Sequence, residues 1–426
     1  MITSAAWAGK RYAVLGLARS GAATVDALLA SGATVTAWDS DEVKRAASKA
    51  DIADLDTVDL SQFDALVASP GVPLNTHPLA AKARAARVAI IGDIELFAQA
   101  RSELPPHKVV GITGTNGKST TTALVHHIIE TAGLPTVMGG NIGLPILSQA
   151  PLPAGGVYVL ELSSYQIDLT QTLDCDVAVL LNITPDHLDR YADFQAYADS
   201  KARLFAMQSA NHAAIIAIGD APSAAIARSL SKRGERLTKI APGVCMDQSR
   251  WPSLQGPHNA QNALAAINAC EALGIDNAAI DAGLASFRGL PHRMERVGEI
   301  AGVAYVDDSK ATNPESAAPA LAAFDRVHWI LGGLSKSDDL DACAPHFDHV
   351  AHAYTIGSAG PTFAALLKDV VPVEEAGTLD RAVAAAHARA KAGDTVLLSP
   401  ACASFDQFRD YEARGDAFRA AVEGLA

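Results

Sequence analysis

The run Gly111-Ile-Thr-Gly-Thr-Asn-Gly-Lys-Ser119 constrains this chain more than any other segment. It follows a strand-like apolar stretch and opens a helix-like one, which is typical of a phosphate-binding loop. In such a loop, glycines let the backbone fold around phosphate oxygens, and the amino end of the helix offers N–H donors. Lys118 would then neutralise phosphate charge and Ser119 would bind magnesium. Isoleucine at position 112 departs from the strict pattern, and an ordinary glycine-rich turn is the alternative.

Composition indicates a globular protein of several domains. The chain has 426 residues, 49% of them hydrophobic and 19% charged, and we expect three domains. It shows no apolar run near the ~18 residues that span a bilayer and no secretory signal at its start, so we expect a cytoplasmic protein without membrane contact. Its five cysteines are scattered, which predicts reduced thiols. A net charge of -13 argues against nucleic acid as a partner.

Strand-like and helix-like segments alternate along the whole chain, which predicts an α/β fold with parallel, doubly wound sheets. Two proline-containing interruptions, Arg101–Lys108 and Arg288–His292, mark candidate boundaries. We therefore predict a Rossmann-like N-terminal domain over 1–105, a P-loop ATPase domain over 106–289 and a Rossmann-like C-terminal domain over 290–426.

The first predicted domain carries a glycine turn, Gly16-Leu-Ala-Arg-Ser-Gly21, followed by Asp39 at the end of the next strand. This arrangement favours a nucleotide-type ligand, with the acid on a ribose, but a tight strand–helix connection is the alternative. Ser69-Pro-Gly71 offers a second turn at the same sheet edge. A nicotinamide dehydrogenase would depend on the first turn alone.

Glu161 and His187 each follow a strand of the central block, so both should face the edge that holds the phosphate loop. A carboxylate and an imidazole beside a triphosphate can bind Mg²⁺. A structural loop histidine is the alternative for His187, and a solvated helix lysine is the alternative for Lys201.

Together, eight strings resemble the Mur ligases of peptidoglycan synthesis, and among them the members that add D-glutamate. They run in the expected order through all three blocks: Gly114–Thr120, Gly140–Gly143, Glu161–Ser164, Asp186–Arg190, His258–Asn262, Pro291–Arg293, Asp308–Asn313 and Ser399–Phe408.

The resemblance implies binding roles for four groups of residues. The uridine diphosphate substrate would contact Ser20, Asp39, Ser40, Pro70, Gly71 and Asn141. ATP would contact Gly114, Thr115, Asn116, Gly117, Lys118, Ser119, Thr120, Asn259, Asn262, Arg293 and Asp308. D-Glutamate would contact Lys310, Thr312, Lys336, Ser404 and Phe405. Two magnesium ions would be organised by Ser119, Glu161, His187 and Lys201, and the catalytic residues would be Lys118, Glu161, His187 and Lys201.

The implied reaction is an ATP-dependent ligation. The L-alanine carboxylate of UDP-N-acetylmuramoyl-L-alanine attacks the γ-phosphate, because hydroxide is too poor a leaving group for an amine to displace, and D-glutamate then opens the acyl phosphate. Lys201 falls where the family carries a carbamylated lysine. Arg19 departs from the apolar residue expected beside the uracil. We expect a monomer.

Two other enzymatic or regulatory classes remain as alternatives. A folylpolyglutamate synthetase shares the phosphate loop, but its sequence would begin at the ATPase domain. A non-catalytic ATP-dependent switch would not need Glu161, His187 and Lys201 together.

Overall fold

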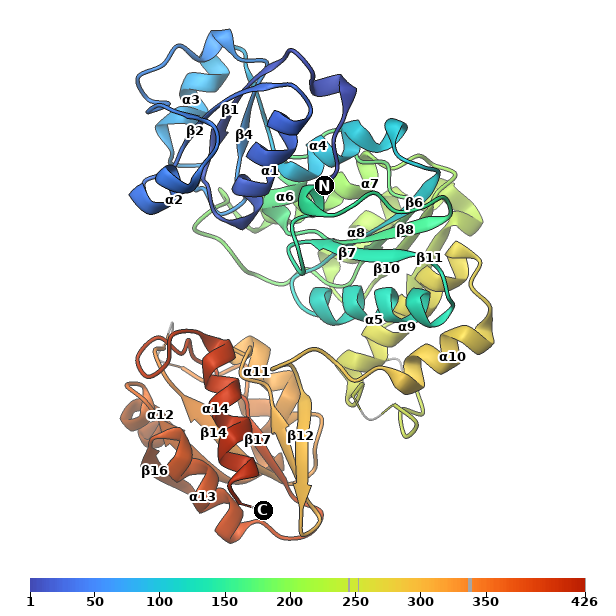
Figure 1. The fold of residues 1–426 in the computed structure, drawn as a ribbon. Coiled ribbons are helices and arrows are strands. Elements are labelled where there is room, and N and C mark those ends of the chain that lie inside the picture. The colour runs from blue at the N-terminus through green and yellow to red at the C-terminus, as the bar shows by residue number, and fades with distance from the viewer. Residues whose placement is uncertain (244–245, 252, 336–338, 426) are drawn as a thin grey trace. The chain divides into compact units, whose positions relative to one another are not determined.

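The computed structural model describes residues 1–243, 246–251, 253–335 and 339–425. The chain forms two compact units, one of Met1–Pro242 with Leu264–Gly283 and the other of Gly243–Ala263 with Leu284–Ala426. The first unit holds two β-sheets and the second holds one (Figure 1). Short 3₁₀ helices lie between the strands and α-helices described below, at Ala5–Trp7, Leu60–Gln62, Arg101–Glu103, Ile146–Ser148, Ser231–Arg236 and Ala344–His349.

The N-terminal sheet has five parallel strands in the order β3-β2-β1-β4-β5, which is half of a doubly wound nucleotide-binding fold. Its strands are β1 (Arg11–Leu15), β2 (Thr34–Trp38), β3 (Asp51–Ile52), β4 (Ala65–Ala68) and β5 (Ala89–Ile91). The helices between and after them are α1 (Arg19–Ala30), α2 (Glu42–Ala47), α3 (Pro78–Ala85) and α4 (Asp93–Ala100).

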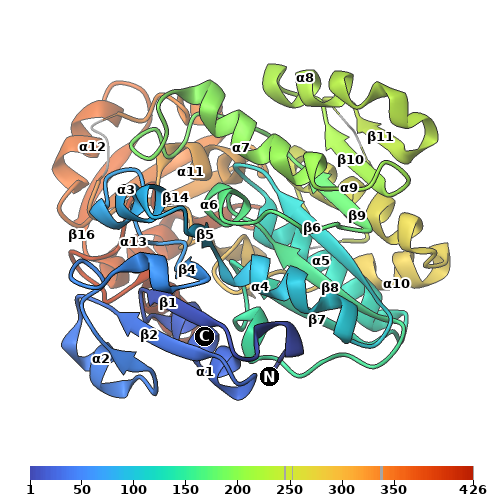
Figure 2. The ribbon, with the colours of Figure 1, turned by 90° about the horizontal axis from the view of Figure 1, so that it is seen from above.

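The central sheet has six parallel strands in the order β11-β10-β9-β6-β8-β7. They are β6 (His107–Thr113), β7 (Thr136–Gly140), β8 (Gly156–Glu161), β9 (Val177–Leu180), β10 (Ala213–Ala217) and β11 (Leu237–Ile240). Their helices are α5 (Lys118–Thr131), α6 (Ser164–Asp168), α7 (Phe194–Ala206) and α8 (Ala221–Ser229). Helices α9 (Pro257–Leu273) and α10 (Asn277–Ser286) each have residues in both units. Helix α5 packs on β6, β7 and β8 (Figure 2).

The C-terminal sheet, in the second unit, has the order β12-β13-β17-β14-β15-β16, and only β12 runs antiparallel to its neighbour. Its strands are β12 (Glu295–Ile300), β13 (Val303–Asp307), β14 (Val327–Gly332), β15 (Val350–Ile356), β16 (Val373–Gly377) and β17 (Thr395–Leu398). Its helices are α11 (Pro314–Leu321), α12 (Gly360–Leu367), α13 (Leu379–Arg389) and α14 (Tyr411–Glu423).

The predicted α/β class is confirmed, and the strands that the sequence predicts at Tyr12–Leu17, Val109–Thr113 and Val327–Leu331 coincide closely with β1, β6 and β14. Strands β8, β14 and β17 are buried along their whole length, as the middle strands of sheets covered on both faces must be. The short strand β11 and the exposed strands β12 and β16 lie at sheet edges and were not predicted. Strands β12 and β16 mix charged residues and glycine with few apolar ones, and β11 has only four residues, so the periodicity of all three is weak.

Helix α4 joins the two sheets of the first unit. The buried carboxylate of Glu95 accepts hydrogen bonds from the backbone N–H groups of Gln171 (2.7 Å) and Thr172 (2.9 Å) and from the Thr172 hydroxyl (2.8 Å). The Phe97 ring lies 5.0 Å from that of Tyr158 on β8. A shared core and a satisfied buried carboxylate therefore fix the N-terminal sheet against the central one.

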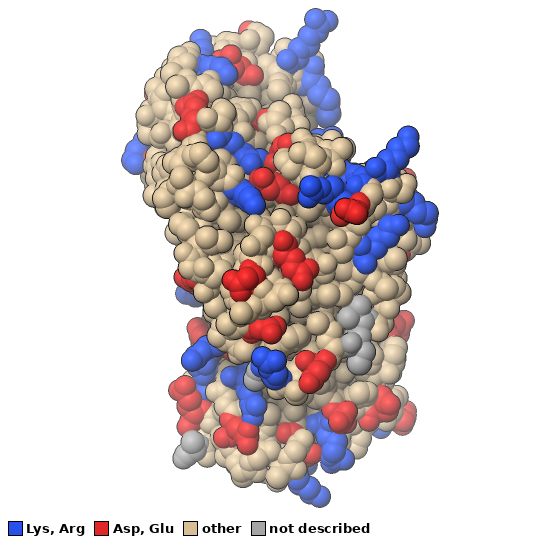
Figure 3. Space-filling view, turned by 90° about the vertical axis from the view of Figure 1, so that its right-hand side faces the viewer, with Lys and Arg blue, Asp and Glu red and all other residues tan. Residues whose placement is uncertain are grey.

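Charged side chains of both signs lie among one another on the face shown in Figure 3. Within the described ranges, none of the helices has the length and apolar character that a bilayer-spanning segment needs.

Candidate active site

The predicted phosphate loop connects β6 to α5, so the strand–loop–helix context is confirmed. Gly117 caps the helix in the left-handed region at φ 83°, and Gly114 has φ 153°. A Cβ atom at Gly114 would lie 3.0 Å from the Cβ of Leu181 on the neighbouring segment. Position 117 therefore favours glycine because of its backbone angle. Position 114 favours glycine because of its backbone angle and because another chain segment lies close to it.

Asn182, directly after β9, holds the phosphate loop in shape. Its Oδ1 accepts hydrogen bonds from the N–H groups of Thr115 (3.1 Å) and Asn116 (2.8 Å), and its Nδ2 donates to the Asn116 carbonyl (3.1 Å). The Thr115 hydroxyl also bonds the Thr184 carbonyl. Sequence reasoning did not assign Asn182 a role, although it lies five residues before His187.

Two lysines converge on one carbonyl oxygen of the loop. Lys118 Nζ donates to the carbonyls of Gly114 (2.9 Å) and Thr115 (2.7 Å), and Lys201 Nζ, from α7, donates to the same Gly114 carbonyl (2.9 Å). Lys201 is only 1% exposed and lies over the Tyr197 ring at 4.7 Å. Burial lowers the pKa of Lys201 well below its usual value, and the charge of Lys118 lowers it further. Lys201 is therefore not the solvated helix lysine that was the alternative.

Glu161 ends β8 and is 2% exposed. Its Oε1 accepts a hydrogen bond from Asn141 Nδ2 at 2.9 Å, whereas its buried Oε2 has no hydrogen-bond partner among the described residues. Gly140, at φ 87°, lets β7 approach this point, since a Cβ there would lie 2.2 Å from the Glu161 carbonyl oxygen. Asn141, predicted to place the substrate, thus also orients the glutamate carboxylate.

His187 lies in the segment after β9, with a positive φ of 54°. Its ring lies 5.0 Å from that of Tyr165, and its Nε2 is 3.4 Å from the Asp186 carboxylate. Partial burial lowers the pKa of His187, and the nearby charges of Lys118 and Lys201 act in the same direction. A neutral imidazole at this place is a competent metal ligand.

The donor set fits divalent metal chemistry. Glu161 offers a buried carboxylate oxygen without a partner in the described part of the chain, and Ser119, also buried, lies in the first turn of α5. Magnesium prefers oxygen ligands of this kind. Lys201 as an amine is not such a ligand, but the carbamate of an uncharged amine is a carboxylate-like one.

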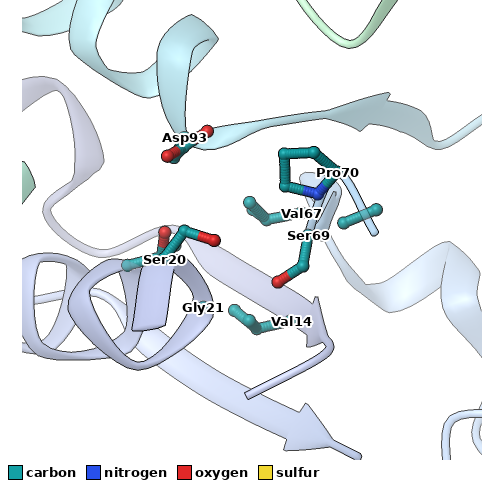
Figure 4. A pocket seen from close by; sticks show the side chains of 9 residues that line it. Val14, Ser20, Gly21, Val67, Ser69, Pro70 and Asp93 are labelled. Atoms are coloured by element: carbon teal, nitrogen blue, oxygen red, sulfur yellow. The ribbon is translucent and has the colours of Figure 1, made fainter. Parts of the chain in front are cut away.

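The N-terminal sheet has a narrow crevice at the carboxyl ends of β1 and β4, without room for a water molecule, which we call the small pocket. Ser20, Ser69 and Pro70 line it together with Asp93, the first residue of α4 (Figure 4). Asp93 is 5% exposed, and burial raises its pKa to about 6. Sequence reasoning did not select Asp93.

The other residues predicted for the nucleotide substrate lie around this sheet edge. Asp39 Oδ2 accepts from the Leu17 N–H at 2.6 Å and its Oδ1 from the Asp41 N–H at 2.9 Å, so the carboxylate fixes the glycine turn. Ser40 precedes α2, and Gly71 is exposed after β4. Arg19 donates to the Gly143 carbonyl at 2.8 Å, a contact between the N-terminal and central sheets' loops.

In the second unit, Asp308 follows β13 and is buried. Its Oδ2 accepts from the Ser399 hydroxyl at 2.8 Å and its Oδ1 from the Met294 N–H at 3.2 Å. Burial raises its pKa to about 7. The neighbouring His292 makes a buried 2.8 Å contact with Asp307, so the turn that carries Arg293 is anchored to the strand end. On α9, the buried side chains of Asn259 and Asn262 bond one another at 3.1 Å.

The residues predicted to bind glutamate come from loops at one edge of the C-terminal sheet. Lys310 and Thr312 follow β13, with Lys310 Nζ over the Tyr411 ring at 3.7 Å. Ser404 is buried and Phe405 is 70% exposed, both after β17. Lys336 lies outside the described residues.

Comparison with family models covers most of the chain in three pieces. The Mur ligase MurD-like N-terminal domain matches residues 10–92, the Mur ligase middle domain matches 112–244, and the Mur ligase glutamate ligase domain matches 292–402. The chain belongs to the Mur ligase family.

Among curated Mur ligases, a UDP-N-acetylmuramoylalanine–D-glutamate ligase from Novosphingobium aromaticivorans is 63% identical over 429 residues, covering 100% of this chain and 97% of that protein. A ligase of the same name from Sphingopyxis alaskensis is also 63% identical, over 435 residues and 100% of both chains. The similarity therefore runs through all three predicted domains.

Solved structures show the same fold at low identity. MurC from Thermotoga maritima, a UDP-N-acetylmuramate–alanine ligase, superposes with a TM-score of 0.60 at 16% identity, covering 98% of this chain and 100% of that one. FolC from E. coli, solved with DHPP and ADP, gives a TM-score of 0.55 at 21% identity but covers only 79% of this chain and 94% of its own. The match of residues 10–92 to a Mur ligase N-terminal domain disfavours the folylpolyglutamate synthetase alternative, whose sequence would begin at the ATPase domain.

Proposed function

We propose that this Mur ligase joins D-glutamate to UDP-N-acetylmuramoyl-L-alanine with hydrolysis of ATP to ADP and phosphate. The observation that carries the substrate assignment is the 63% identity, over the full chain, to ligases of that name. The buried side chains of Glu161 and Lys201, with Lys118 bonded to the same loop carbonyl as Lys201, support the chemistry. We expect the enzyme to act in the cytoplasm as a monomer.

The first step is activation of the L-alanine carboxylate. Its oxygen attacks the γ-phosphorus of ATP, the bond from that phosphorus to the bridging oxygen breaks, and ADP leaves, which gives an acyl phosphate. We assign Lys118 and residues 114–120 to the phosphates, where a cation and N–H donors stabilise the charge that develops. Asn182 fixes the backbone of Thr115 and Asn116 through their N–H groups, so the shape of the loop is set before substrate arrives.

Magnesium, when bound, would neutralise phosphate charge and polarise the γ-phosphate. We assign Ser119, Glu161 and His187 to two such ions, together with Lys201 as a carbamate. The lowered pKa of Lys201 supports this modification, because only an uncharged amine adds to carbon dioxide. Asn141 keeps the Glu161 carboxylate oriented through Oε1.

The amine of D-glutamate then attacks the acyl carbon, and phosphate leaves. We assign Lys310, Thr312, Lys336, Ser404 and Phe405 to this amino acid. Asn259, Asn262, Arg293 and Asp308 are assigned to the nucleoside and phosphates of ATP. Ser20, Asp39, Ser40, Pro70, Gly71 and Asn141 are assigned to the uridine diphosphate substrate.

The test is a turnover assay with ATP, Mg²⁺ and UDP-N-acetylmuramoyl-L-alanine, in which D-glutamate, L-glutamate, L-lysine and meso-diaminopimelate are compared as acceptors. Release of phosphate and a nucleotide product lengthened by one residue should require D-glutamate. Phosphate release without the nucleotide substrate would instead support an ATP-dependent switch, and product formed with another acceptor would overturn the glutamate assignment.

A further inference from the structure

Arg414 is a buried guanidinium at the edge of the C-terminal sheet from which the predicted glutamate-binding loops leave. It lies on α14 and is 1% exposed. Its Nε donates to the Ser309 hydroxyl at 2.9 Å, and its Nη2 donates to the carbonyls of Ser309 (2.8 Å) and Cys402 (3.0 Å). Because Ser309 follows β13 and Cys402 follows the adjacent parallel strand β17, these bonds tie the two loops together.

A third loop reaches the same guanidinium. Gly333 follows β14, the other neighbour of β17, and a Cβ on it would lie 3.2 Å from Arg414 Nη1. Next to it, Leu334 and Ala403 exchange backbone hydrogen bonds of 2.8 and 3.0 Å. Residues near the start of the loops after β13, β14 and β17 therefore meet around one side chain.

The charge of Arg414 is not matched by a bonded carboxylate within the described ranges. The oxygens that accept its hydrogen bonds there are neutral, and its buried Nη1 has no acceptor among them. The acidic groups whose charge it senses are engaged elsewhere: Asp406 accepts from the Ser358 N–H at 2.8 Å, and Asp307 contacts His292 at 2.8 Å. A buried cation without a counterion is costly, so an anionic ligand nearby would recover part of that cost.

We propose that Arg414 is a positioning residue for the acceptor amino acid, holding the loops after β13, β14 and β17 in their binding arrangement and supplying positive potential for an acceptor with two carboxylates. The inference rests on the proposed function for the identity of the acceptor. Burial lowers the pKa of Arg414 to about 10, so the group remains charged at neutral pH.

The experiment compares the wild type with Arg414→Met, Arg414→Lys and the control Arg409→Met, whose side chain is 83% exposed just before α14. KM is measured separately for D-glutamate, ATP and UDP-N-acetylmuramoyl-L-alanine, and the melting temperature is recorded for each variant. We expect the KM for D-glutamate to rise about tenfold or more in Arg414→Met and less in Arg414→Lys, because one lost charge contact corresponds to about a factor of ten. The other two KM values and the Arg409→Met values should stay within about twofold.

Arg414→Lys keeps the charge, so it remains informative where the methionine variant does not fold. An unchanged KM for D-glutamate in a folded variant would overturn the inference, as would an equal rise of all three KM values, which indicates a purely structural role. A wild type that turns over without D-glutamate overturns the proposed function itself, and the inference about the acceptor falls with it.

Discussion

Replacing Asp93 by asparagine should change how the stability of this protein depends on pH. Burial raises the pKa of Asp93 from 3.8 to about 6, although its Oδ1 accepts the Ile94 N–H at 3.0 Å. In the unfolded chain the carboxyl titrates near its ordinary value. Between these pH values the folded state binds more protons, so the free energy of unfolding falls as pH rises. The difference of about 2 pKa units lowers the free energy of unfolding by roughly 3 kcal/mol at pH 7. This destabilisation is absent below about pH 4, where the carboxyl is protonated in both states.

The asparagine side chain of this variant cannot ionise but keeps an oxygen for the Ile94 N–H. The stability of Asp93→Asn relative to wild type should therefore increase by about 3 kcal/mol between about pH 4 and pH 7.5, less a few tenths for the lost charge at the amino end of α4. Urea unfolding followed by tryptophan fluorescence at several pH values across this range measures the difference. A stability difference that does not vary with pH would refute the reasoning.

A matched control has the opposite sign. Asp41 caps α2 in an exposed position by accepting the Val43 N–H at 2.9 Å. Desolvation alone would raise the pKa of Asp41, but the hydrogen bonds from Val43 and Lys44 together with the Lys44 charge outweigh it, so the pKa is lowered. Asp41 therefore contributes stability above its unfolded pKa that is lost in acid. The stability of Asp41→Asn relative to wild type should therefore fall as pH rises. If both variants instead changed in the same direction, the effect would be a general one of removing a carboxylate.

Three further substitutions test the phosphate loop. Lys118→Ala should lower kcat/KM by about 10²–10³, which is equivalent to about 3–4 kcal/mol in the barrier, and should have little effect on the melting temperature. Full activity of this variant in an ADP-release assay would exclude a catalytic role for Lys118. Lys201→Ala should remove most turnover while the dissociation constant of ATP, measured by titration calorimetry, stays comparatively unchanged; retained turnover contradicts metal binding through a carbamate. Asn182→Ala removes the side-chain acceptor of the Thr115 and Asn116 N–H groups, although Thr115 keeps the backbone carbonyl of residue 182 at 2.9 Å. The lost Asn116 bond is worth about 0.5–1.5 kcal/mol, so KM for ATP should rise, and an unchanged KM would show that the loop holds its shape without the Asn182 side chain.

The sequence predicted the fold well where local signals agree with the global one. Buried parallel strands such as β8 are continuous apolar runs, and the glycine and lysine pattern at 111–119 places a loop between a strand and a helix. The edge strand β12, Glu295–Ile300, was missed because its mixed sequence does not encode its antiparallel pairing with β13. Tertiary context decides such strands.

The sequence predicted which residues belong to the candidate site, but not the hydrogen bonds between them. Glu161 and His187 were selected because each lies at or after the end of a strand, and Lys201 was selected through the resemblance to the Mur ligases. No pattern showed that Lys201 and Lys118 share the Gly114 carbonyl. Two residues were missed because their roles exist only in the folded chain. Asn182 acts on a loop 66 residues away, and Asp93 is distinguished by its burial beside the small pocket.

The site at the phosphate loop contains buried groups that destabilise the protein when no ligand is bound. Glu161 Oε2 lacks a partner in the described structure, and Lys201 is held beside a second lysine, where its charged form is disfavoured. Each arrangement is costly in a folded chain without ligand, of order 1–3 kcal/mol for an unsatisfied buried polar group. Such groups persist where the reaction needs them, because a phosphate, a metal ion or a modified amine supplies the missing partner. Binding of Mg²⁺ and ATP should therefore stabilise the wild type more than Glu161→Gln, since the neutral side chain removes much of the mismatch that the ligands relieve.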